Sequence, residues 1–185
     1  SSFEWEDGSF DPERTITEAG TYTVFATDVN GCMDTASYDI ITFPLPDFEV
    51  EGTPYFCAGS STVLQASAPF TSYEWNGSAG DSTLTVSTAG LFVLEVVDTN
   101  GCQNQASLQV EAIPLPVADP GMPDTLTCTI ESVAIGGNGT STGPAFVYEW
   151  TGPGINAQTA VVASPTVSTA GTYELIVTDT IHGCV

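Results

Sequence analysis

Positive charge is almost absent from this chain of 185 residues. Lysine does not occur, and Arg14 is the single arginine against 23 Asp and Glu residues, which gives a formal net charge of −22 at pH 7. Proteins that bind nucleic acid or an anionic membrane surface need clustered Lys and Arg to neutralise phosphates. The composition therefore excludes nucleic acid as a partner. It also excludes a Lys–Asn isopeptide cross-link.

Long apolar runs and recognisable catalytic sets are also missing. No stretch of 18 apolar residues occurs, so we expect no membrane insertion in this sequence. His182 is the single histidine, and no Ser-His-Asp set, Cys-His pair or HExxH motif accompanies it. The scattered carboxylates are typical of a solvated surface, so we do not expect an enzyme.

Three copies of one sequence pattern are present. The stretch VSTAGLFVLEVVDTNGC, which ends at Cys102, recurs with small changes before Cys32 and Cys184, and an aromatic-Glu-Trp motif ends at Trp5, Trp75 and Trp150. Pro-Leu-Pro occurs at 44–46 and again at 114–116. Self-similarity at a fixed period indicates a repeat protein. We divide the chain into unit 1 (1–45), unit 2 (46–115) and unit 3 (116–185).

The two outer units lack part of the pattern. Aligned on the repeat, Ser1 falls in mid-unit, so unit 1 is expected to lack its first strands. Val185 aligns with Gln103, so unit 3 is expected to lack its last strand. Half a sandwich leaves an unpaired edge exposed. We therefore expect the sequence to be part of a longer array.

Apolar residues alternate with polar ones in each unit, with no helical periodicity. Residues 21–27 alternate in unit 1, and Glu95 and Glu174 point away from the apolar face of the equivalent segments. Further strands are predicted at 61–66, 82–87, 106–112 and 132–136. Short strands separated by turn signals around a central Trp indicate an all-β fold of tandem Ig-like Greek-key sandwiches, joined by short, stiff Pro-rich linkers.

The aromatic residues have structural roles in this prediction. Ala-Gly-x-Tyr before the alternating strand is similar to the tyrosine corner of Ig-like sandwiches, with Tyr22 and Tyr173 in the key position and Phe92 without the hydroxyl. The tryptophans could suggest carbohydrate stacking. Their identical position in every unit favours a buried core instead.

The combined motifs resemble a known group. The segment Cys57-Ala-Gly-Ser-Ser-Thr-Val-Leu64, followed by Tyr-x-Trp and then by the pattern before Cys102, resembles the Ig-like and PKD-like tandem repeats of Bacteroidota secreted surface adhesins. Those include gliding-motility-associated proteins exported by type IX secretion. The resemblance implies a stalk or adhesive filament at the cell surface. Unit 3 departs from it at His182 and at 129–131, where its turns are expected to differ.

Five cysteines recur at repeat-fixed positions without CxxC pairs. This pattern argues for disulfides and an oxidising, extracellular location rather than for zinc. The simplest pairing is Cys57–Cys102 and Cys128–Cys184, with Cys32 bonded to a partner outside the sequence. Because the two cysteines of one unit are expected at opposite ends of a sandwich, an inter-unit staple such as Cys57–Cys184 is the rival.

Two smaller sets of residues are candidate sites. Asp28 and Asp98 resemble half of a calcium loop, although a hairpin turn whose Asn-Gly supplies positive φ explains the same spacing. We expect no cofactor, with calcium as the alternative. Asp followed by Ser or Thr resembles the Bacteroidota O-glycosylation sequon and makes this chain a candidate glycoprotein. The candidate residues are Thr35, Ser82, Thr125 and Thr180.

The sequence thus predicts a disulfide-braced, rigid spacer in an extracellular filament or adhesin stalk. Its expected partners are further copies of the same repeat or chain. The alternative is a ligand- or carbohydrate-binding accessory region of a secreted enzyme, with the enlarged loops 136–145 and 151–164 of unit 3 as the contact surface.

Overall fold

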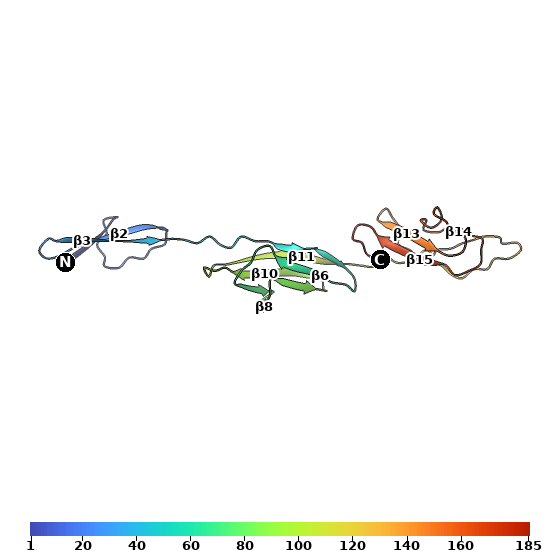
Figure 1. Ribbon diagram of the computed structural model, residues 1–185, viewed down its shortest axis with the longest axis horizontal. Helices are drawn as coiled ribbons and strands as arrows, with labels where there is room; N and C mark the ends of the chain where they lie inside the picture. The colour runs from blue at the N-terminus through green and yellow to red at the C-terminus, as the bar shows by residue number, and fades with distance from the viewer.

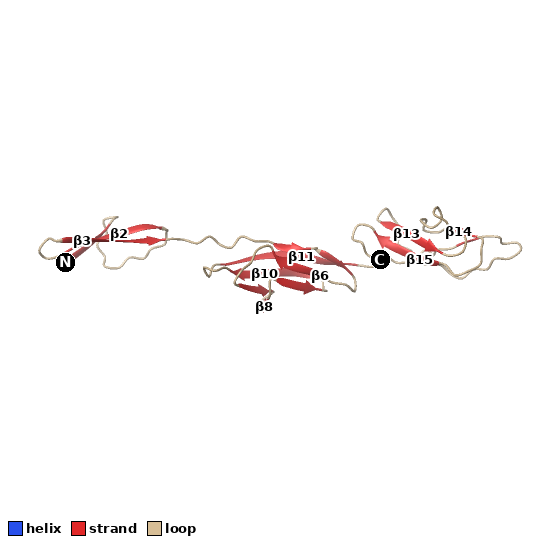
Figure 2. Ribbon diagram, viewed as in Figure 1, coloured by secondary structure: helices blue, strands red, loops and turns tan.

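The computed structural model describes residues 1–185 as three β units arranged in a row (Figure 1). Only strands and loops occur, so the predicted all-β class is confirmed (Figure 2). The chain has no helix long and apolar enough to cross a bilayer. The N-terminus lies at the outer end of unit 1, and the C-terminus lies on the side of unit 3 that faces unit 2 (Figure 1).

Unit 1 is a single antiparallel sheet of three strands. It contains β1 (Ser2–Trp5), β2 (Gly20–Thr27) and β3 (Met33–Ile40), in the order β1-β2-β3. No second sheet covers it, and most of its side chains are exposed. Arg14 lies over Trp5 and Tyr22, with its guanidinium carbon 5.9 and 5.1 Å from the ring centres. The chain's one arginine thus covers part of the apolar face of unit 1.

Unit 2 is a complete sandwich of two sheets. The smaller sheet has the order β4-β6-β9 and the larger β5-β11-β10-β7-β8. The strands are β4 (Val50–Gly52), β5 (Tyr55–Cys57), β6 (Thr62–Ala66), β7 (Ser72–Trp75), β8 (Ser78–Gly80), β9 (Thr83–Val86), β10 (Gly90–Val97) and β11 (Gln103–Ile113). All pairings are antiparallel except β5 with β11. This is the expected Ig-like sandwich.

The core of unit 2 lies between these sheets. Trp75 is 4% exposed and packs in a cluster with residues from both layers, including Leu64 of the smaller sheet and Leu94 of the larger. The Trp75 indole donates a hydrogen bond to the Asp81 carbonyl at 3.0 Å, so its polar atom is satisfied inside the core. Trp150 of unit 3 is 2% exposed and makes the equivalent bond to Val162. The core interpretation is confirmed for both tryptophans.

Unit 3 has two sheets of two strands each. They pair β12 (Val133–Ala134) with β14 (Thr166–Val167), and β13 (Phe146–Thr151) with β15 (Glu174–Asp179). Trp150, Val167 and Val177 are its buried apolar side chains. Unit 3 therefore has a smaller core than unit 2, with strand pairing on one side of β15 only.

Tyrosine corners form where the sequence predicts them. The Tyr22 hydroxyl donates to the Glu18 carbonyl at 2.9 Å, and the Tyr173 hydroxyl donates to the Thr169 carbonyl, in both cases four residues upstream. Phe92 lacks the hydroxyl and packs against the core of unit 2.

Every predicted strand has an observed counterpart, but several bounds differ and some observed strands, among them β4, β5 and β8, were not predicted. The predicted strands 61–66, 82–87, 106–112 and 132–136 correspond to β6, β9, β11 and β12. The last strand of unit 2 is longer than predicted, since it begins at Gln103. The short β5, which carries Cys57, was not predicted because its partner is the distant end of β11.

Candidate functional site

The junction between units 2 and 3 contains the most distinctive chemistry of the chain. Here β5 runs parallel to the end of β11, pairing Cys57 with Ile113. The Ala58 amide donates to the Ile113 carbonyl at 2.8 Å, and the Glu111 amide donates to the Pro54 carbonyl at 3.0 Å. Because Ile113 leads directly into the Pro114–Pro116 linker, these bonds hold Cys57 at the end of unit 2 that faces unit 3.

A disulfide crosses this junction. Cys57 of unit 2 is bonded to Cys184 of unit 3, with Cα atoms 5.5 Å apart and a sequence separation of 127 residues. The predicted pairings Cys57–Cys102 and Cys128–Cys184 are therefore wrong, and the rival inter-unit staple is the one observed.

The length of β11 explains why the intra-unit pairing fails. Cys102 immediately precedes the first residue of β11, whereas Cys57 lies beside the last residue. At about 3.4 Å per residue, the two cysteines are separated by roughly 35 Å. A disulfide needs Cα atoms about 4.4–6.8 Å apart. One sandwich cannot bridge its own ends, but neighbouring units placed end to end bring such cysteines together.

Three cysteines carry no disulfide. Cys32 and Cys128 are exposed, and Cys102 is partly buried. The expectation that Cys32 has a partner outside the sequence stays a prediction.

The turn before Cys184 is organised by a buried carboxylate. One Asp179 oxygen accepts the Ile181 amide at 2.8 Å, and the other lies 2.7 Å from His182 Nδ1. The hydrogen bond from His182 is the main cause that lowers the pKa of Asp179, against the opposing effect of desolvation. Asp179 therefore fixes the loop that presents Cys184, despite the extra residue in this turn.

The His182 ring also reaches unit 2. It meets the Tyr55 ring edge to face, with centroids 4.8 Å apart. Tyr55 lies in β5, two residues before Cys57, so this contact runs beside the disulfide. Neither residue was predicted to take part in the junction. The replacement of Asn-Gly-Cys by His182-Gly-Cys was the signal in the sequence, because only the stapled turn carries a histidine.

The side chains of the candidate metal ligands Asp28 and Asp98 accept hydrogen bonds from backbone amides of their own turns. In each turn, one carboxylate oxygen accepts the amides of the Asn two residues on and of the Cys four residues on, all at 2.8 Å. Gly31 and Gly101 adopt φ of 85° and 81°, so the positive φ lies at glycine, as the turn prediction requires.

Hydrogen bonding also accounts for the electrostatics of these two aspartates. The Cys32 and Asn30 amides lower the pKa of Asp28. For Asp98, desolvation opposes the shift, but the Cys102 and Asn100 amides outweigh it and lower the pKa. No cluster of three or more His, Cys, Asp or Glu residues suited to a metal ion occurs in the structure.

The four glycosylation candidates are all exposed, but one hydroxyl differs from the rest. Thr180 donates its hydroxyl to the Ala145 carbonyl at 2.9 Å, so a sugar there would replace a hydrogen bond. The other three hydroxyls make no protein hydrogen bond, and they belong to Thr35, Ser82 and Thr125. The structure thus leaves these three side chains open to modification.

The enlarged loops of unit 3 frame shallow depressions. One, of about 490 Å³, lies between Asp119 and the glycines at 136–139. Another, of about 480 Å³, lies between β13 and residues 157–161. Asp119 accepts the Gly121 and Gly139 amides at 3.0 Å, which ties the first loop down. Because Trp150 is buried, it offers no open face for stacking on a sugar.

No protein-family model and no curated protein matches the sequence. Among solved structures, the chain is similar to SGBP-B of the Bacteroides ovatus mixed-linkage glucan utilization locus, in complex with a mixed-linkage heptasaccharide. The identity is 14%, the match covers 98% of this chain and 54% of that one, and the TM-score is 0.25.

A second similar structure is that of the N-terminal eight Ig domains of Down Syndrome Cell Adhesion Molecule. Its identity is 13%, the match covers 94% of this chain and 34% of that one, and the TM-score is 0.30. The chain thus spans about half the length of the first of these structures and a third of the second. At such TM-scores neither likeness adds to the fold described above.

Proposed function

We propose that this chain is a spacer segment of an extracellular filament or cell-surface stalk, in which disulfides between repeats hold neighbouring β sandwiches in line. The observation that carries the proposal is the Cys57–Cys184 bond across the junction of units 2 and 3. Disulfides persist in oxidising surroundings, which supports an extracellular location.

A disulfide inside one sandwich would stabilise that sandwich alone. A disulfide between two sandwiches also limits the angles that they can adopt, and the Tyr55–His182 contact adds a second point of attachment at the same junction. Two attachment points beside a short Pro-Leu-Pro linker restrict both bending and twisting. A row of such units keeps its two ends at a fixed separation, which is the property that a stalk needs.

The charge of the chain supports the same role. A net charge of −22 with a single cation keeps a long, thin molecule soluble and apart from other acidic surfaces. Further repeats or chains of this kind are the proposed partners. We propose no enzymatic activity.

Small-angle X-ray scattering tests the proposal. We expect the oxidised chain to give a larger maximum dimension than the variant Cys57→Ser/Cys184→Ser, whose unit 3 is free to fold back. The variant Cys102→Ser is the matched control, since it removes a cysteine outside the staple, and it should scatter like the parent chain. Equal dimensions for all three proteins would refute a spacer role for the disulfide.

A further inference from the structure

The enlarged loop after β13 leaves open a strand edge that is covered in unit 2. In unit 2, β8 pairs with β7, and Tyr73 lies opposite Gly80. In unit 3 the chain after β13 forms a loop, residues 152–165, in place of such a strand. One backbone hydrogen bond joins this loop to β13, from the Trp150 amide to the Ala160 carbonyl at 3.0 Å. Tyr148, the counterpart of Tyr73, therefore has no strand beside it on this edge.

The backbone of Tyr148 is available for pairing on that edge. The Ala145 carbonyl accepts the Thr180 amide at 2.8 Å and so faces the β15 side, whereas the Trp150 amide faces the loop. Because the backbone groups of a strand alternate in direction, the N–H and C=O of Tyr148 point to the same side as the Trp150 amide. No loop backbone group bonds to either of them. An added strand would thus find one donor and one acceptor there.

A groove of about 480 Å³ lies beside this edge. Its walls include Val147 of β13 and the loop residues Ala157, Ala160 and Val161. Val147 is 51% exposed and Val161 is 62% exposed, so both walls present apolar surface. The residue of unit 2 equivalent to Val147 is Ser72, which makes the apolar groove a property of unit 3 alone.

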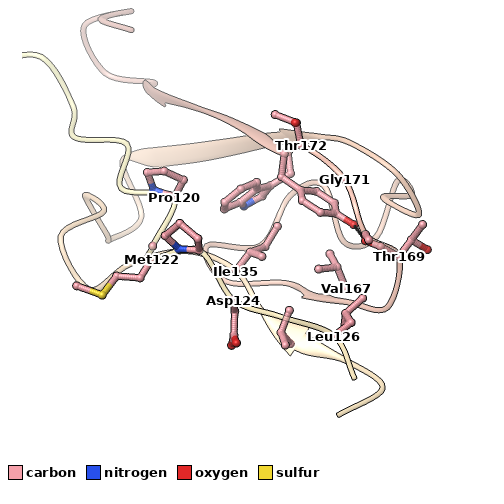
Figure 3. Close-up of a pocket in the computed structure, with 15 residues that line it drawn as sticks. Pro120, Met122, Asp124, Leu126, Ile135, Val167, Thr169, Gly171 and Thr172 are labelled. Carbon is pink, nitrogen blue, oxygen red and sulfur yellow. Dashed lines mark hydrogen bonds between the residues drawn. The ribbon is translucent and has the colours of Figure 1, made fainter. Parts of the chain in front are cut away.

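The groove has a fixed wall and is separate from the other pocket of unit 3. Within the loop, the Asn156 carbonyl accepts the amides of Thr159 at 3.1 Å and Ala160 at 2.9 Å, which holds the wall as one tight turn. The other pocket, of about 410 Å³, is bordered by Val167 and Gly171 (Figure 3). The two share no residue. The groove thus lies on the side of β13 that faces away from β15.

Electrostatics restrict the kind of segment that can bind in the groove. Glu149 lines it and is exposed, with the apolar Ile176 opposite on β15. Unit 3 contains no Lys or Arg that could neutralise this carboxylate. Because the whole chain has a net charge of −22, a second copy or an acidic peptide would be repelled. The groove therefore favours a basic segment of a different protein.

We propose that the groove beside β13 is a docking site for one extended, basic peptide segment of a partner protein, which pairs antiparallel with Tyr148. In this register one peptide residue exchanges both hydrogen bonds with Tyr148, and the residues before and after it lie beside Glu149 and Val147. The segment therefore carries Lys or Arg, then a small residue, then an apolar residue such as Val. The inference does not rest on the spacer proposal.

Amide exchange followed by NMR on the full 185-residue chain tests the site. The probe is the synthetic peptide acetyl-Thr-Lys-Ala-Val-Thr-amide, in about 150 mM salt to screen unspecific charge attraction. At a peptide concentration ten times the dissociation constant, exchange of the Tyr148 amide should slow about tenfold. The Tyr73 amide is the internal reference and should not change, because β8 already covers it.

Two control peptides separate strand pairing from charge attraction. In acetyl-Thr-Lys-Pro-Val-Thr-amide, proline removes the N–H that would donate to the Tyr148 carbonyl. In acetyl-Thr-Glu-Ala-Val-Thr-amide, a carboxylate replaces the cation beside Glu149. Neither control should protect Tyr148. In the chain, Glu149→Gln keeps the shape of the groove and should weaken binding of the Lys peptide by up to about fivefold.

Four results would overturn the proposal. The first three are no protection at millimolar peptide, equal protection by the proline peptide, and protection confined to other edges such as those of β3 or β15. The fourth is protection of Tyr148 by the chain alone, rising with its concentration, which would assign the groove to a second copy. Neither Cys57 nor Cys184 lines the groove, so the scattering experiment on the staple is unaffected and the two proposals fail separately.

Discussion

The two junctions of this molecule share a linker motif but differ in how they hold their units. The first junction has Pro44-Leu-Pro46 and the second Pro114-Leu-Pro116. At the first, Ile41, Phe43 and Leu45 are exposed along an extended segment (Figure 1). A single side-chain bond, from Asn104 to the Pro46 carbonyl at 2.7 Å, ties that linker to unit 2.

The second junction adds a covalent bond and an aromatic contact to the same motif. The Cys57–Cys184 disulfide and the Tyr55–His182 pair both join unit 2 to unit 3. We propose that Pro-Leu-Pro sets the spacing of the units, while the staple sets their relative orientation. We expect the relative orientation of two units to be fixed only where a staple is present.

Loss of the staple should have the largest effect. The variant Cys57→Ser removes a cross-link that closes a long loop, and we expect it to lower the free energy of unfolding by about 2–5 kcal/mol. Urea denaturation of the oxidised proteins measures this change. The control Cys102→Ser should differ from the parent by less than about 0.5 kcal/mol. Equal losses in both variants would mean that the disulfide contributes no special stability.

Removal of the aromatic contact should have a smaller effect. We expect Tyr55→Leu to cost about 1 kcal/mol, because it keeps an apolar side chain but loses the edge-to-face pair with His182. Thermal unfolding followed by circular dichroism measures the loss. The double variant with His182→Asn should lose less than the sum of the two single losses, and strict additivity would show that the two rings are not coupled.

Acidification should loosen the second junction through Asp179. The folded state lowers the pKa of this carboxyl, so the stabilisation is complete above its ordinary value of 3.8 and is lost as the pH falls below it. The pKa values of Glu6, Asp7, Asp28 and Asp98 are lowered as well, so acidification of the parent chain reports all five carboxyl groups. The variant Asp179→Asn isolates one of them. Its unfolding temperature should fall less than that of the parent between pH 5 and pH 3, and parallel curves would contradict the assignment.

Linker changes should have the smallest and most local effect. Pro44→Gly removes the φ restriction in the first junction, where no staple compensates, and it should widen the range of distances between units 1 and 2. Pro114→Gly makes the same change beside the intact staple and should leave the range of distances between units 2 and 3 unchanged. Single-molecule energy transfer measures both. Equal widening at the two junctions would mean that the staple does not restrain orientation.

Much of the fold follows from the sequence because its determinants are local. Alternation in 21–27 predicted β2, and the Ala-Gly-x-Tyr motif predicted the corner hydrogen bonds of Tyr22 and Tyr173. Burial of Trp75 and Trp150 followed from their matched place in each unit. Each of these features is determined by residues close together in the sequence and by packing within a single unit.

The disulfide pairing did not follow, because it depends on long-range geometry. Counting two cysteines per unit favoured Cys57–Cys102, but only the full length of β11 shows that these residues lie at opposite ends of the sandwich. The strand β5 was missed for the same reason, since its three residues pair with a segment more than 50 positions away. Tyr55 and His182 meet only once two units stand end to end.

The most direct test uses the three cysteines that carry no disulfide. Dyes on Cys32 and Cys102 report the first junction, and dyes on Cys102 and Cys128 report the second, with the remaining thiol replaced by serine in each case. Single-molecule energy transfer should give a broad distance distribution across the first junction and a narrow one across the second, which broadens in the Cys57→Ser/Cys184→Ser variant. Two distributions of equal width, unchanged when the staple is removed, would contradict the account.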